Sequence, residues 1–183
     1  MTAPWNLSLP TTLEVGGEDK AIRTDYRVAL DCFLALTDAE LDGTNRALEV
    51  IDILFVDEID PRDWNEAIKK AIWYLNGGED PSDKKEPQLV SWEQDFNLIA
   101  SPISKDLGQD IRGMKHLHWW SFLSAYMAIG ECLFGQVVAI RSKKARGKPL
   151  DKTDREFYRR NRELVDIKKP LTLAEEEILK EWV

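Results

Sequence analysis

Cysteine, histidine and long apolar runs are scarce in this sequence of 183 residues. The two cysteines, Cys32 and Cys132, lie far apart beside apolar residues, which is typical of structural thiols in a reducing compartment. The first residues have neither the basic start nor the apolar run of a signal peptide. No stretch approaches the roughly 18 apolar residues of a membrane span. We therefore expect a cytoplasmic protein that does not bind a membrane.

Motifs that carry catalysis are also lacking. There is no Walker-type glycine loop, no Gly-x-Ser-x-Gly elbow and no His-Glu-x-x-His pair. On a helix, His116 and His118 would point about 200° apart, so they cannot share one metal ion. A histidine that packs beside tryptophan, with one ring nitrogen hydrogen-bonded, is the simpler interpretation. We expect no enzyme activity, no cofactor and no metal site.

The composition predicts one globular domain. Hydrophobic residues make up 43% of the chain and include seven tryptophans, which is enough to build a core, while 32% charged residues keep the surface solvated. The net charge of −8 is unevenly distributed: residues 141–162 carry +7 and the remainder carries −15. One segment of the sequence is therefore basic and the rest is acidic.

Local patterns predict a β-hairpin within residues 9–24, with Gly16 and Gly17 supplying the positive φ angles of its turn. Asp25 and Thr44 are suitable N-caps for the two helices that follow. The predicted apolar faces of these helices are Tyr26, Ala29, Leu30, Phe33 and Leu34 in the first, and Ala47, Leu48, Ile51, Leu54 and Phe55 in the second.

Start and stop signals place the later helices. Asp60 followed by Pro61 opens a strongly amphipathic helix that Gly77 and Gly78 end, and residues 79–87 form a polar loop. Ser91 and Gln94 have the spacing of a capping box. The helix they open is expected to be disrupted at Pro102.

The segment from Leu117 to Phe134 is apolar almost all round, which predicts one central helix packed on several sides. Thr172 and Glu175 form a candidate capping box for a carboxy-terminal helix. The predicted fold is therefore a mainly α, single-domain helical bundle with a small amino-terminal hairpin. Its parts are a helical core at 25–138, a basic helical segment at 139–167, and a carboxy-terminal helix or tail at 168–183.

Two features invite a binding interpretation. Trp119 and Trp120 could form a stacking or peptide-binding platform, but burial is favoured within an apolar helix, with Trp120 inside and Trp119 facing core, partner or sister subunit. The candidate basic patch could bind nucleic acid or pair with the acidic body. This patch consists of Arg141, Lys143, Lys144, Arg146, Arg155, Arg159 and Arg160.

A set of short motifs follows one another along the chain in a recognisable order. The most specific is the signature formed by Gln94, Asp95, His118, Trp119, Trp120 and Phe122. Weaker pieces are Ile22 to Arg27, Trp73 to Gly78, Ile140-Arg141 and Phe157 to Arg160. With these motifs the chain resembles the bacteriophage gene-product-fifteen family of tailed phages and prophages over roughly residues 9 to 165. This sequence departs from the family pattern at Ile99 to Pro102 and at Gln109 to Ile111.

The resemblance implies a protein encoded among phage tail genes, near those of the major tail protein and the tape measure protein. Such a protein would be a tail assembly chaperone that escorts the tape measure protein in the host cytoplasm. It could also contact the major tail protein and associate with itself. An alternative is a minor tail or neck component that stays in the virion, and a second is nucleic-acid binding through the basic patch.

Overall fold

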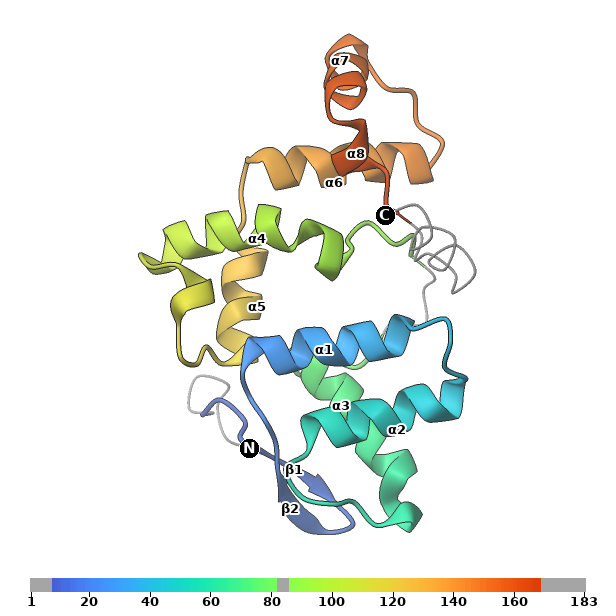
Figure 1. Cartoon of the computed structure of the whole chain (residues 1–183), viewed down its shortest axis with the longest axis vertical. Helices are drawn as coiled ribbons and strands as arrows, with labels where there is room; N and C mark the ends of the chain where they lie inside the picture. The colour runs from blue at the N-terminus through green and yellow to red at the C-terminus, as the bar shows by residue number, and fades with distance from the viewer. Residues whose placement is uncertain (1–7, 82–85, 169–183) are drawn as a thin grey trace, which may run out of the picture.

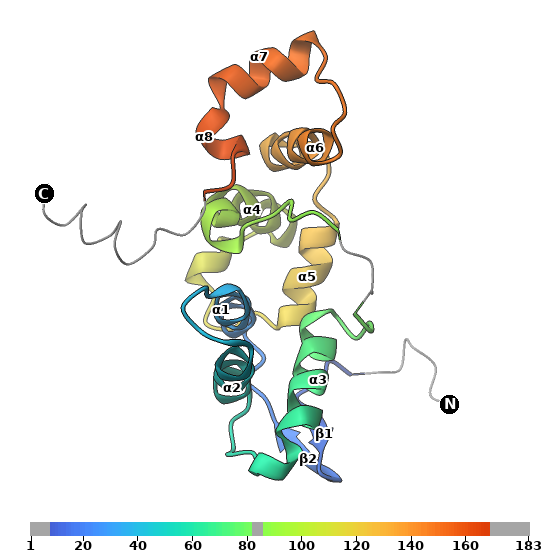
Figure 2. The same ribbon diagram turned by 90° about the vertical axis from the view of Figure 1, so that its right-hand side faces the viewer.

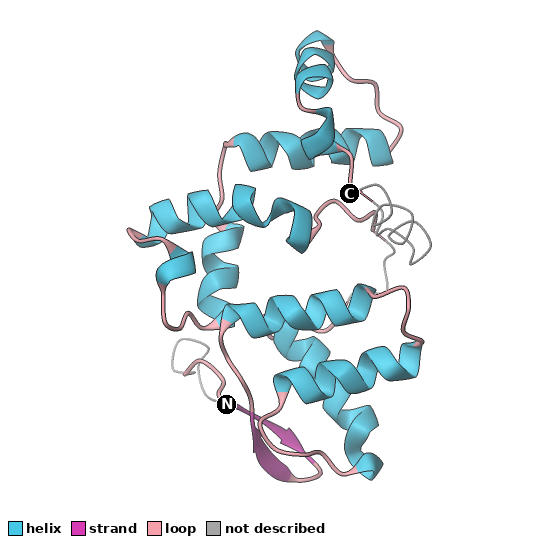
Figure 3. Ribbon diagram, in the orientation of Figure 1, coloured by secondary structure: helices cyan, strands magenta, loops and turns pink. Residues whose placement is uncertain are grey.

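The computed structural model describes residues 8–81 and 86–168 (Figure 1). Within these ranges the chain is mainly helical, with a two-stranded antiparallel hairpin near its amino terminus (Figure 3), which confirms the predicted fold class. The elements in chain order are β1 (Thr12–Val15), β2 (Glu18–Ala21), α1 (Tyr26–Thr37), α2 (Gly43–Leu54), the 3-10 helix η2 (Pro61–Asp63), α3 (Trp64–Leu75), α4 (Trp92–Leu107), the 3-10 helix η3 (Ile111–Gly113), α5 (Trp119–Met127), α6 (Leu133–Ala145), α7 (Lys152–Arg160) and α8 (Arg162–Val165).

The hairpin turns where the sequence predicts. Gly16 and Gly17 adopt φ angles of 62° and 76°, a region that L side chains rarely occupy. Leu13 and Val15 are buried while Glu14 between them is exposed, as expected for a strand with one face on the core. The hairpin thereby covers one end of the helical body.

Helix caps are mostly placed as predicted. The Asp25 side chain accepts a hydrogen bond from the backbone of Arg27, and Asp60 caps η2, which leads directly into α3. The predicted cap at Thr44 is wrong. The Asp42 carboxylate accepts the bond from the backbone N–H of Asn45 at 2.8 Å, so α2 begins one residue before the threonine. A carboxylate at this position satisfies a free helix N–H and also favours the positive end of the helix dipole.

The buried face of α1 differs from the predicted one. Its buried residues are Tyr26, Ala29, Cys32 and Ala35, whereas Leu34 is 45% exposed. The small side chains of this face let α2 pack closely on α1. Leu30 and Leu36 pack half-buried against the edge of the main core, and only Leu34 among the leucines of α1 is exposed.

Helix α4 continues through Pro102, so the predicted disruption is wrong. A proline inside a helix costs roughly 3 kcal/mol, because it removes one backbone hydrogen bond and crowds the preceding turn. The fully buried Ile99 and Ile103 lie on either side of Pro102 in the sequence, and their packing offsets this cost. The helix ends at Gly108, which has a φ of 72°.

The predicted long apolar helix is in fact two helices, α5 and α6, separated by residues 128–132. Helix α5 buries Trp119, Phe122 and Ala125 in the main core, whereas α6 packs against α4 and α8. Phe134 at the start of α6 also belongs to the main core, whereas Val137 and Ile140 of α6 belong to a smaller one. The predicted division at residue 139 falls inside α6.

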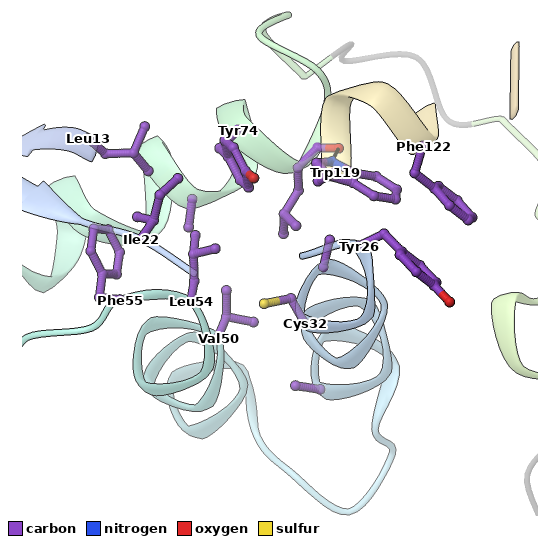
Figure 4. Close-up of a cluster of buried hydrophobic side chains, with 14 of the residues drawn as sticks. Leu13, Ile22, Tyr26, Cys32, Val50, Leu54, Phe55, Tyr74, Trp119 and Phe122 are labelled. Carbon is purple, nitrogen blue, oxygen red and sulfur yellow. Dashed lines mark hydrogen bonds between the residues drawn. The ribbon is translucent and has the colours of Figure 1, made fainter. Parts of the chain in front are cut away.

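The main core lies between the hairpin and helices α1 to α5, with Phe134 of α6 at its edge, and Figure 4 shows part of it. A smaller core of Val137, Ile140 and Val165 joins α6 to α8 at the opposite end. Helix α4 lies between the two, with α1 on one side and α6 to α8 on the other in both views (Figures 1 and 2). Leu98 of α4 contacts both cores.

The carboxy-terminal helix predicted from Thr172 and Glu175 lies outside the described residues. Within the described residues, Cys32 is buried, Cys132 is half-buried, and both are free thiols. No helix of the described ranges combines the length and the apolar character needed to cross a membrane.

Candidate functional site: signature residues and an apolar groove

The two signature tryptophans are buried to different extents, and Trp120, which was predicted to lie inside, is the less buried of the two. Trp119 is fully buried and donates its indole N–H to the carbonyl of Leu75 at 3.0 Å. Trp120 is half-buried and donates to the carbonyl of Tyr74 at 2.9 Å. Phe122 is fully buried and stacks on Trp119 at a centroid distance of 5.5 Å. Both indole groups therefore hold the end of α3 against α5.

This packing requires glycine at the two positions after the end of α3, Gly77 and Gly78. Gly78 has a φ of 91°, and a Cβ there would lie 2.8 Å from the Cη2 atom of Trp120. A Cβ on Gly77 would lie equally close to Leu123. The two matching segments that contain Gly77-Gly78 and Trp120 therefore pack directly against each other.

His118 is a structural cap of α5. Its Nδ1 accepts a hydrogen bond from the backbone N–H of Trp120 at 3.0 Å, while its Nε2 donates to the carbonyl of Pro10 at 3.0 Å. These roles define a neutral ring with its proton on Nε2. His116 instead contacts the Thr24 hydroxyl at 2.9 Å. Within residues 8–81 and 86–168, no three His, Cys, Asp or Glu side chains gather as metal ligands.

Asp95 forms a buried ion pair with Arg141. The carboxylate is fully buried, the arginine is 5% exposed, and two parallel hydrogen bonds of 2.5 and 2.9 Å join them. The Asp95 carboxylate also accepts a hydrogen bond from the backbone N–H of Ser91. The predicted capping box gave this acceptor role to the Gln94 side chain. Only half of that box is correct, because the Ser91 hydroxyl does accept the N–H of Gln94.

The Gln94 side chain is used elsewhere. Its Nε2 donates to the carbonyls of Glu163 and Asp166 at 3.1 Å, and its Oε1 accepts the backbone N–H of Lys168 at 2.9 Å. Arg141 donates to the carbonyls of Leu164 and Val165. Gln94 and Arg141 together fasten α8 and the residues after it to the start of α4.

The candidate basic patch is only partly a surface. Arg141 is buried, and Lys143 pairs with Asp154 at 2.5 Å, a hydrogen bond that lowers the pKa of the carboxyl. Lys144 pairs with Asp166 at 2.5 Å. This leaves four residues exposed and without an ion pair in the part of the chain that the structure describes: Arg146, Arg155, Arg159 and Arg160.

An apolar groove of about 410 Å³ lies between α1 and α4, and the sequence patterns did not predict it. Its floor is apolar and its rim carries charges of both signs. The floor consists of Tyr26, Leu30, Leu34, Trp92 and Phe96, and the rim of Arg27, Asp31, Glu93 and Arg112. The Asp31 side chain is exposed on this rim, and partial desolvation raises the pKa of its carboxyl.

One end of the groove is held in place by Arg27. Its Nη2 donates to the carbonyls of Ile111, Arg112 and Met114 at 3.3, 3.2 and 3.0 Å. These bonds tie η3, which contributes Arg112 to the rim, to the start of α1. The groove is thus built largely from regular helices with a fixed closing turn. The signal for it in the sequence was the width of the apolar stripe on α1, which exceeds what one core contact needs.

These features define a mainly helical protein whose signature residues are structural and whose α1 and α4 enclose an open apolar groove. The family model described as Bacteriophage Gp15 protein matches residues 6–167, so the chain belongs to this family of bacteriophage proteins. That match confirms the resemblance carried by the signature. No curated protein and no solved structure matches the chain significantly.

Proposed function

We propose that this protein is a phage tail assembly chaperone that binds the tape measure protein in the host cytoplasm, and that it does so without catalysing a reaction. Membership of the bacteriophage family supports the phage part of the proposal. The tail part follows from the place among tail genes that the family resemblance implies. The groove between α1 and α4 supports a protein-binding role.

The apolar floor of the groove carries this proposal. Leu34 is 45% exposed although it lies on a well-formed helix beside the main core. An amphipathic helix can place its apolar face in such a groove, with spaced side chains as anchors. A tape measure protein is very long and rich in helices, so it offers many such faces. Charges of both signs on the rim would then contact the polar edges of the bound helix.

The test is a titration of the full chain against fluorescently labelled fragments that tile the tape measure protein. We expect at least one fragment to bind, and Leu34→Asp to weaken that binding by about tenfold or more, because it places a charge on the apolar floor. Val56→Asp is the matched control, since Val56 is 53% exposed and lies outside the groove. Failure of every fragment to bind, or equal binding by the Leu34 variant, contradicts the proposal.

Mass spectrometry of purified virions separates the chaperone from a structural tail component. A chaperone is absent from the finished particle or present only in traces. A stoichiometric amount of the chain in virions would instead establish the structural role.

A further inference from the structure

The described chain ends at the amino-terminal end of α4, the helix that forms one wall of the groove. The backbone N–H of Lys168 donates to the Gln94 side chain at 2.9 Å. Gln94 lies in the first turn of α4, next to Trp92 and Glu93, which line the groove. The residues that follow Lys168 therefore start at the end of α4 that carries Trp92 and Glu93, on the side of this helix that contacts α8.

The sequence of residues 171–183 has the pattern of a groove-binding helix. Thr172 and Glu175 give a candidate capping box at its start. The apolar residues fall at helical spacing on one side: Leu171, Ala174, Ile178, Leu179 and Trp182. As a helix these thirteen residues would be about 20 Å long, whereas the stretch of α1 from Tyr26 to Leu34 spans about 12 Å. The segment is long enough to cover the groove.

We propose that residues 171–183 of the same chain occupy the α1–α4 groove when no partner is bound, so that a partner helix must displace them. The regulatory half of this inference rests on the proposed function, but occupancy of the groove does not. The carboxy-terminal segment is thus a built-in competitor for the partner site.

Tethering favours this occupant over a second copy of the chain. A segment joined by a few residues is present at its site at an effective concentration in the millimolar range, far above that of free protein. Its apolar side would cover the exposed Leu34. The rim carries Arg27 and Arg112 beside Asp31 and Glu93, so charge alone does not select the segment. The apolar contacts and the short tether select this segment as the occupant of the groove.

Hydrogen exchange of the full chain without a partner tests the occupancy. We expect backbone amides of residues 171–183 to exchange more slowly than unstructured amides, and both Leu34→Asp and Trp182→Asp to remove this protection. Met127→Asp is the control, because Met127 is 72% exposed and does not line the groove, and it should leave the protection intact. Unchanged thermal midpoints would show that the variants stay folded.

Three results would overturn the proposal. The tail amides could exchange freely in the unmodified chain, or they could stay protected in the Leu34 variant. Protection could also rise with protein concentration together with dimer formation, which would assign the groove to a second copy.

Partner affinity provides a second, independent measurement. If the tape measure fragment competes with the tail, Trp182→Asp should raise its affinity by about tenfold, because the competitor is weakened. An unchanged affinity would remove the regulatory half of the proposal. Failure of every fragment to bind would contradict the proposed function alone, since the exchange measurement does not use a partner.

Discussion

Asp95 and Arg141, 46 positions apart in the sequence, form a buried two-bond ion pair that joins α4 to α6. Arg141 also donates to the carbonyl of Leu89 and to two carbonyls of α8. Such a pair is costly to desolvate, and its charges are tolerated because nearly every polar atom is bonded. The pair therefore sets how the α6–α8 end sits on the body.

Replacing Asp95 with asparagine should be strongly destabilising. The change leaves the Arg141 charge buried without its partner, and we expect the free energy of unfolding to fall by about 3–5 kcal/mol in a urea titration. Glu18→Gln is the matched control, because the Glu18–Lys20 pair is at the surface and its loss should be barely measurable. Similar effects of the two changes would contradict the importance of the buried pair.

The two signature tryptophans should differ in their effect on stability. Trp119→Ala creates a cavity in the main core and should cost about 3–5 kcal/mol of unfolding free energy. Trp120 is half-buried, so Trp120→Ala should cost about 1–2 kcal/mol less. Chemical denaturation of the two variants measures the difference. A larger loss for Trp120→Ala would contradict this order of burial.

Removing the Tyr74 hydroxyl should not harm the fold. This oxygen is fully buried and has no hydrogen-bond partner within the described residues, and burial raises the pKa of the phenol. We expect Tyr74→Phe to be neutral or to raise the unfolding free energy by about 1 kcal/mol, because an unsatisfied polar group is removed. A clear loss of stability would show that the hydroxyl has a bonded partner.

Thiol labelling should distinguish the two cysteines. Burial raises the pKa of Cys32 to about 12, so near pH 8 it is neither ionised nor accessible. Cys132 is half-buried and should react with iodoacetamide first, while Cys32 should react only after unfolding. The unfolded chain loses the Cys32 proton near the ordinary pKa of 9.0, whereas the folded chain keeps it. The free energy of unfolding should therefore fall only as the pH rises above 9.0. Peptide mapping after timed alkylation identifies the labelled residue.

Several signals that depend only on neighbouring residues were predicted correctly, although the cap of α2 and half of the capping box of α4 were not. The glycine pairs at 16–17 and 77–78 and the caps at Asp25 and Asp60 needed no tertiary information. The break between α5 and α6 was missed because the apolar residues continue across it: Phe134, after the break, packs in the same main core as Trp119 and Phe122. Pro102 was misjudged for a related reason, since the packing of Ile99 and Ile103 outweighs a local penalty.

The groove and the ion pair could not be predicted in this way. Nothing near Arg141 in the sequence distinguishes it from the lysines that follow, and only the fold brings Asp95 to it. The exposure of Leu34 depends on which side of α1 receives α2. Which of Trp119 and Trp120 is the more deeply buried could not be predicted, because adjacent helical residues lie only about 100° apart and both indoles donate to the end of α3.

The bridge between Asp25 and His118 has a consequence for folding during synthesis. The backbone of Tyr26 donates to Leu117 at 2.9 Å, and that of Trp119 donates to Thr24 at 2.8 Å. These contacts close a loop of more than ninety residues, which is entropically costly and slow to form. The first third of the chain therefore cannot complete its core on the ribosome until Trp119 has emerged, and its apolar surfaces stay open to chaperones or to misfolding until then.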